Sequence, residues 1–108
     1  MLKNNFLKGT LQTLILRLLA DRGQMYGYQI IKHLSTVTQQ QILVKEAALY
    51  PALHKLEARG LLESEFREVS GRQRKYYRLS EKGKKVARQE GTELAQFTAA
   101  IQQLLRPS

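Results

Sequence analysis

Apolar residues recur at spacings of three and four in three segments of the first 60 positions, a pattern typical of helices with one buried face. The first segment ends at Asp21-Arg22-Gly23, the second runs from Gln24 to Leu34, and the third ends at Gly60. We therefore predict three helices. Their buried faces carry Phe6, Leu7, Leu11, Leu14, Ile15, Leu18 and Leu19 in the first, Tyr28, Ile31 and Leu34 in the second, and Leu49, Leu53 and Leu56 in the third.

The segment between the second and third helices allows two assignments. Residues 35–41 are polar and predict a connection. The tract Ile42-Leu43-Val44 that follows has strand propensity, but it suits the lead-in to the third helix equally well. Gly27, near the start of the second helical pattern, predicts a close approach by a neighbouring element.

Residues 61–79 have the composition of a β-hairpin. Two runs rich in strand-forming residues, Leu61–Val69 and Gln73–Leu79, flank the turn residues Ser70-Gly71. The side chains expected to point inward are Phe66, Tyr77 and Leu79.

A last helix is predicted from Ser80, whose hydroxyl is suited to capping the helix start. Its seam residues, spaced alternately by three and four, cannot all be buried by so small a domain, and pairing with a second copy is their simplest use. Packing of this helix back on the first helix is the alternative. Gly91, in mid-helix, predicts a kink or a close contact. The seam consists of Ala87, Glu90, Leu94, Phe97, Ile101 and Leu104, and the predicted dimer interface consists of Leu11, Leu94, Phe97, Ile101 and Leu104.

The order of these elements predicts a mainly α fold with a small β-hairpin wing. We expect a winged helix-turn-helix DNA-binding domain at residues 1–79 and a C-terminal dimerisation helix at residues 80–108. A chain of 108 residues is long enough for one such domain without a disulfide or a metal to hold it.

The charge distribution favours a polyanionic partner. The net charge is +9, from 18 Lys and Arg against 9 Asp and Glu, and residues 72–88 hold eight bases against the single acid Glu81. A solvated charged face is the alternative, but Tyr76 and Tyr77 interleave with these bases and favour nucleic acid. The eight bases are Arg72, Arg74, Lys75, Arg78, Lys82, Lys84, Lys85 and Arg88.

The outward face of the third helix is small and nearly uncharged. Such a face solvates a protein poorly, but it fits the DNA major groove, where Ala side chains can touch thymine methyl groups. The residues near this face are Ala47, Pro51, His54 and Ala58, with Ala48 and Lys55 beside them.

Several function classes are disfavoured. Cysteine is absent, which excludes disulfides and thiolate metal sites and favours a cytoplasmic location. The apolar run Leu14–Ala20 is interrupted by Arg17 and falls short of the roughly 20 residues that span a membrane. His33 and His54 lack partners at metal-ligand spacing, and neither a nucleophile elbow nor a phosphate loop is present. We expect no cofactor, no membrane partner and no enzymatic activity.

The chain resembles the PadR family of bacterial winged-helix transcriptional regulators, in particular its short members. The resemblance covers nearly the whole chain, and the order and spacing of its motifs make it specific. The motifs are Tyr26-Gly27-Tyr28, Leu49-Tyr50-Pro51-Ala52-Leu53 with Leu56-Glu57 and Gly60-Leu61, and Gly71-Arg72 through Lys75-Tyr76-Tyr77-Arg78-Leu79 with Gly83.

The resemblance implies a homodimer that binds an inverted-repeat operator in double-stranded DNA and represses transcription until a small, often aromatic, effector releases it. It also implies that the third helix enters the major groove while the wing meets the backbone or the minor groove. The residues expected to contact DNA are Lys45, Ala47, Ala48, Tyr50, Pro51 and Lys55 around the third helix, Tyr26 before it, and Arg72, Arg74 and Lys75 on the wing.

Two features depart from that pattern. Members that bind flat drugs commonly stack them on tryptophan in the last helix, whereas this chain has no Trp and Phe97 is the last helix's only aromatic residue. Phe97 therefore suits either an effector site or a helix-pairing core. Glu46 places an acid at the start of the third helix, where it would repel phosphate unless it meets a cytosine amino group.

Some roles stay open from the sequence. Tyr50 suits either a phosphate contact or a core tyrosine with an exposed hydroxyl, and Lys82, Lys84 and Lys85 suit an extension of the DNA footprint. The leading hypothesis is a specific DNA-binding regulator. A protein-interaction module on the same scaffold, which would not require the basic wing, and a non-specific nucleic-acid binder are the alternatives.

Overall fold

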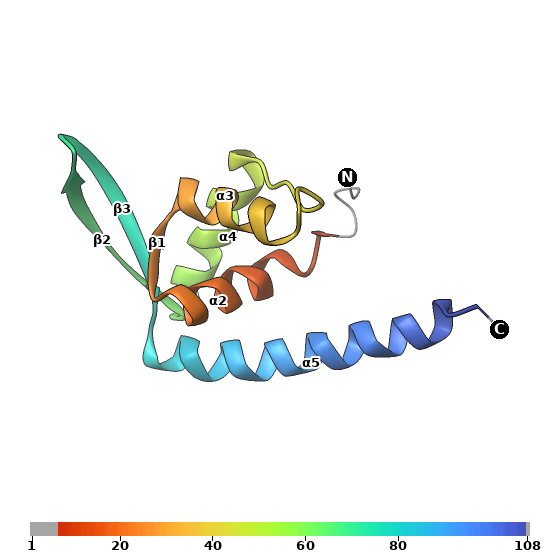
Figure 1. The fold of residues 1–108 in the computed structure, drawn as a ribbon. Helices are drawn as coiled ribbons and strands as arrows, with labels where there is room; N and C mark the ends of the chain where they lie inside the picture. The colour runs from red at the N-terminus through yellow and green to blue at the C-terminus, as the bar shows by residue number, and fades with distance from the viewer. Residues whose placement is uncertain (1–6, 108) are drawn as a thin grey trace.

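A computed structural model describes residues 7–107 and orders them as a helix, a short strand, two helices, a hairpin and a long helix (Figure 1). The predicted winged helix with a C-terminal helix is confirmed. Phe6, assigned above to the first helix, lies outside the described residues. The elements are α2 Leu11–Arg22, β1 Gln24–Tyr26, α3 Gly27–Val37, α4 Glu46–Ala58, β2 Leu62–Val69, β3 Arg72–Leu79 and α5 Glu81–Leu105.

The prediction that a helix occupies residues 24–34 is wrong for its first three residues. They form β1, which pairs antiparallel with β3 and completes a sheet of order β1-β3-β2. Gly23, at a φ of 90°, ends α2 and turns the chain toward β3. Met25 then faces the core opposite Tyr77. A strand of three residues is too short to show an alternating pattern, so only the pairing partner reveals it.

The core lies between α2, α3 and α4 and one face of the sheet. All three predicted α4 residues, Leu49, Leu53 and Leu56, are fully buried, and α2 contributes four buried residues. Because the apolar stripes of three helices and the sheet converge here, the exposed face of α4 is held at a fixed angle to the hairpin. The buried residues of α2 are Ile15, Leu16, Leu18 and Leu19.

The hairpin projects from the helices as a wing (Figure 1). Its turn has positive φ at Ser70 (53°) and Gly71 (76°), as a two-residue hairpin turn requires. Tyr77 and Leu79 are buried as predicted, but Phe66 is 63% exposed. Phe66 pairs with Lys75, beyond the Tyr26–Tyr76 pair where β1 ends, so the core does not extend far enough to cover it.

The tract at residues 42–44 is the lead-in to α4 and not a strand. Val44 is buried, and the backbone N–H of Ile42 donates to Thr38 Oγ1 at 3.0 Å. The α3–α4 connection is therefore anchored at both ends, which fixes where the exposed start of α4 lies.

The start of α5 is capped by Ser80, whose Oγ accepts from the Gly83 N–H at 3.0 Å, as predicted. The first half of α5 packs along α2, where Ala87 is buried and Glu90 accepts from Thr13 Oγ1 at 2.9 Å. The alternative of packing on the first helix is thus observed for this half. A Cβ added to Gly91 would meet nothing within 4 Å, so the predicted close contact does not occur within the described chain.

The second half of α5 extends past the end of α2 (Figure 1). It carries an apolar stripe, with Phe97 62% exposed and Leu104 78% exposed. Because these side chains are exposed, the stripe is a surface of α5 that no other described segment covers along its length.

Within residues 7–107, no helix has both the length and the apolar character needed to cross a membrane.

Candidate nucleic-acid interface

Helix α4 presents its small outward face to solvent. Ala47, Pro51, His54 and Ala58 are all exposed, as the helical wheel predicts. Pro51 has no N–H, so it cannot bond to the Ala47 carbonyl one turn earlier. The other predicted contacts around α4 are also exposed, namely Lys45, Ala48, Tyr50 and Lys55.

Tyr50 joins α4 to the start of α3. A Cβ added to Gly27 would lie 2.8 Å from Tyr50 Cζ, so the missing side chain at Gly27 makes room for the tyrosine ring. The close approach predicted at Gly27 is confirmed. Tyr50 is nevertheless 37% exposed, because its ring is covered on one side only.

Arg74 of the wing and Tyr26 of β1 form part of a stack across one face of the sheet. The Arg74 guanidinium lies 4.4 Å from the centroid of the Tyr26 ring, and Tyr26 meets Tyr76 edge to face with centroids 5.3 Å apart. Arg67 lies 4.7 Å from the Tyr76 ring at the far side. Tyr26 is half-buried and therefore supports the base of the wing from the neighbouring strand β1.

An open cavity of about 500 Å³ separates the wing from the starts of α3 and α4. It brings together five of the ten predicted DNA contacts: Tyr26, Tyr50, Arg72, Arg74 and Lys75. Glu46, the acid at the start of α4 that would repel phosphate, also lines this basic cavity. Three further residues line the cavity that the sequence patterns did not assign to DNA contact: Gly27, Tyr28 and Gln73. Tyr28 was predicted on the buried face of the second helix, and that prediction is wrong because its side chain is exposed.

The other five predicted contacts lie along the opposite flank of α4. There an open cavity of about 720 Å³ runs between α4 and α2, and its lining also includes Leu11 and Glu90. Helix α4 is thus a ridge between two hollows, one basic and one largely apolar. The five residues on this flank are Lys45, Ala47, Ala48, Pro51 and Lys55.

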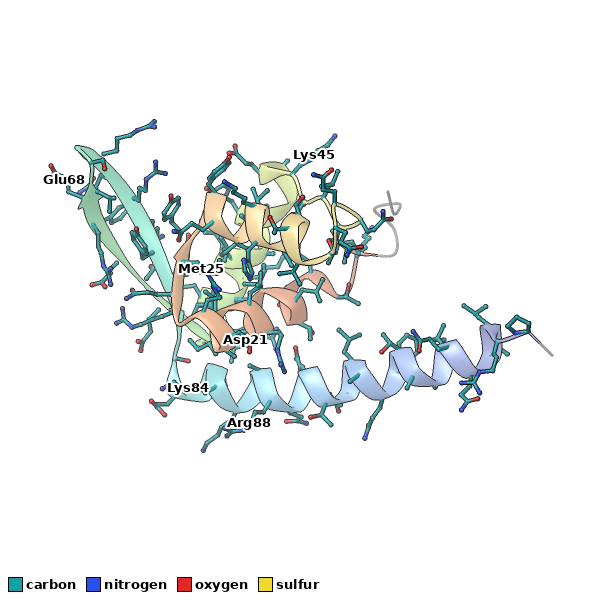
Figure 2. The ribbon with its side chains drawn as sticks, in the orientation of Figure 1. Asp21, Met25, Lys45, Glu68, Lys84 and Arg88 are labelled. Carbon is teal, nitrogen blue, oxygen red and sulfur yellow. The ribbon has the colours of Figure 1, made fainter. Side chains whose placement is uncertain are left out.

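The basic residues at the start of α5 lie on another side of the molecule. In Figure 2, Lys84 and Arg88 project from α5 on the side opposite to Lys45. Lys84 pairs with Glu81 at 3.1 Å, and Lys82 Nζ donates to the Arg59 carbonyl at 3.3 Å. The proposed extension of the footprint over these lysines is not supported by this arrangement.

Tyr77 forms the inner end of the wing. Burial raises the pKa of its phenol, and the nearby Glu57 carboxylate and Tyr50 add to that rise. The tyrosine therefore stays neutral at any physiological pH. It packs the base of the wing against α4 without adding charge to the basic cavity.

An exposed helix with a small-residue face, flanked by a basic β-hairpin, defines the winged-helix class of DNA-binding proteins. The model of the Transcriptional regulator PadR-like family matches residues 15–89. The chain therefore belongs to the PadR family and is a DNA-binding transcriptional regulator. Members of this family are DNA-binding proteins rather than enzymes.

Individual relatives agree with this assignment. Transcriptional regulator Rv3488 of Mycobacterium tuberculosis is 38% identical over 79 residues, which are 73% of this chain and 70% of that protein. The structure of a transcriptional regulator from Clostridium thermocellum aligns with a TM-score of 0.84 at 29% identity, over 98% of this chain and 100% of that one. A PadR-like regulator of Bacillus cereus aligns with a TM-score of 0.80 at 26% identity, over 96% and 99% of the two chains.

Proposed function

We propose that this protein is a cytoplasmic repressor that binds an inverted-repeat operator as a homodimer. Helix α4 enters the major groove, and the wing follows the adjacent backbone or minor groove. The observation that carries the proposal is the basic cavity, where the exposed start of α4 faces Arg72, Arg74 and Tyr26 of the sheet. A scaffold used only for protein binding would not require cations on both sides of a small-residue helix.

Base recognition is assigned to α4. Ala47 and Ala48 offer methyl groups to thymine, and Pro51 lets the backbone approach the groove without a bulky polar group. Tyr50, half exposed at the edge of the helix, donates its hydroxyl to a phosphate. Lys45 and Lys55 flank the small face and contact the backbone.

Replacing Arg72 and Arg74 by Ala is expected to weaken binding to operator and random DNA by the same factor, roughly 10- to 50-fold near physiological salt, because both arginines neutralise phosphates. The slope of log K against log salt concentration should become shallower by about two. Fluorescence anisotropy across a salt series measures both quantities. The control is Lys84→Ala with Lys85→Ala, which removes the same charge from α5. An unchanged slope in the arginine variant would remove the wing from the phosphate contacts.

The homodimer is assigned to α5, with residues 1–79 as the DNA-binding unit and residues 80–108 as the dimerisation helix. Support comes from the apolar stripe on the second half of α5, where Phe97, Ile101 and Leu104 are exposed. Two copies related by a twofold axis would place two α4 helices on the two halves of an inverted repeat. The proposed interface comprises Leu11, Leu94, Phe97, Ile101 and Leu104.

A small aromatic effector is assigned to the same interface. Phe97 is exposed in the described chain, and a dimer would bring two such rings near its axis, where a flat molecule could stack. Release of operator by planar aromatic compounds, lost in Phe97→Ala, would support this site. Release that survives the substitution would place the effector elsewhere.

The experiment that tests the function is binding of the purified protein to its own upstream DNA and to a scrambled duplex across a salt series. A preference of roughly 10³ or more for the upstream DNA, with a steep salt slope, is expected. Equal affinity for both duplexes would indicate a non-specific nucleic-acid binder. Absence of binding to either would favour a protein-interaction module.

A further inference from the structure

Glu57 is an acidic residue on the last turns of α4, and it contacts both strands of the wing. Its carboxylate accepts a hydrogen bond from Ser64 Oγ of β2 at 2.6 Å, and it lies 3.8 Å from Lys75 Nζ of β3. Its charge also helps to raise the pKa of Tyr77, on the same strand as Lys75. One side chain of α4 thus contacts both strands of the hairpin.

The strand register explains why Lys75 faces Glu57. Ser64 pairs with Tyr77 and Phe66 with Lys75, and directly opposed residues of antiparallel strands share one face. That face turns toward α4, and the Lys75 ammonium lies 5.5 Å from the Tyr77 ring centroid and 5.8 Å from that of Phe66. Arg72 and Arg74 occupy alternate positions and therefore share the other face.

The outer part of the wing has little other support. Strand β1 ends at the Tyr26–Tyr76 pair, so the hairpin beyond that pair has only two strands. A two-stranded ribbon is marginally stable and twists readily without a further contact. The contacts of Glu57 with Ser64 and Lys75 lie at this transition, where they set the angle between the hairpin and α4.

We propose that Glu57 is a positioning residue that fixes the wing relative to α4 and pairs with Lys75, so that this lysine makes no phosphate contact although it lines the basic cavity. The inference rests on the proposed DNA-binding mode and deepens it. Lys75 then forms an ion pair between the wing and α4 instead of contacting a phosphate. Arg72 and Arg74 remain the basic residues of the wing that contact the DNA backbone.

The salt dependence of DNA binding distinguishes a lysine that is paired within the protein from one that contacts a phosphate. Each neutralised phosphate contributes about 0.9 to the slope of log K against log salt concentration. Lys75→Met should therefore leave the slope unchanged, because the lysine is already paired. Glu57→Gln keeps an oxygen acceptor for Ser64 but frees Lys75, so the slope should steepen by about one. The preference for upstream over random DNA should fall several-fold, because the wing is no longer held at its angle.

The matched control is Glu68→Gln, which removes the same charge from the hairpin instead of from α4. Glu68 lies near the wing tip and, among the residues the structure describes, forms no ion pair (Figure 2). Its slope should stay within about 0.3 of the wild-type value. The double variant Glu57→Gln with Lys75→Met should return to the wild-type slope while keeping the lowered preference. Thermal unfolding of each variant establishes that it is folded.

A slope that is unchanged in Glu57→Gln, or one that becomes shallower by about one in Lys75→Met, would overturn the assignment. So would an equal steepening in Glu68→Gln, because a general field effect would then explain the result. These slopes are measurable on random DNA as well. If the wild-type protein showed no preference for its upstream DNA, the proposed function would fail while the role of Glu57 was still tested.

Discussion

Ile101→Asp is expected to convert the proposed homodimer into a folded monomer. Ile101 lies on the apolar stripe of α5 beyond the end of α2, at 37% exposure in the single chain. A second copy covering it would bury an unpaired carboxylate, at a cost of about 3–5 kcal/mol, which weakens self-association by at least about 100-fold. Sedimentation velocity over a concentration series measures the change.

The same variant should lose most of its affinity for a full inverted repeat. A monomer binds one half-site at a time and forfeits the high effective concentration of the second α4. The matched control is Gln96→Asp, which adds the same charge at an exposed position of α5 outside the apolar stripe and should remain dimeric. A dimeric Ile101→Asp protein would show that the stripe is not the subunit interface.

Gly83→Ala is expected to destabilise the fold strongly. Gly83 is buried in the first turn of α5, and a Cβ placed there would overlap the Leu61 carbonyl oxygen. That oxygen also accepts the Ser80 N–H at 3.0 Å, so it cannot move away without breaking the cap region. We expect a loss of at least about 2 kcal/mol in the free energy of unfolding and a fall in Tm of more than about 8 °C.

Gly91→Ala is the control for helix propensity, because it makes the same substitution in the same helix. The Cβ at this position meets nothing within 4 Å, so alanine should stabilise the helix by roughly 0.5–1 kcal/mol. Thermal and chemical denaturation at matched protein concentration compare the two. A Gly83→Ala protein as stable as the wild type would show that Gly83 and the Leu61 carbonyl are not in close contact.

Most of the fold could be predicted because its signals are local. Helix spacing located α2 and α4, a turn-compatible Ser70-Gly71 located the hairpin, and Ser80 located the start of α5. These signals depend on side chains close in sequence, where a periodic pattern or a cap is complete within one or two turns. The exposed face of α4 followed from its buried face, since one determines the other on a helical wheel.

The departures all depend on partners distant in sequence. Strand β1 exists because β3 offers an edge to it, and Phe66 is exposed because the core ends before its position on the hairpin. Lys75 is a basic residue of the wing and was therefore expected to contact DNA, but it lies beside Glu57, which is 18 positions away in the sequence. No pattern along the chain shows that Glu57 will meet Lys75, because the two residues come from different elements.

The amino-acid sequence by itself therefore determined the class of protein, most of the elements and the face of α4 that is exposed, because periodicity, capping and charge act over short stretches. Only the tertiary structure decided how the basic residues are divided. It places Arg72 and Arg74 on one face of the wing and Lys75 on the other, beside Glu57. The reason is physical: strand register and the angle between wing and α4 arise from packing between distant segments, and these determine which charges are free to bind.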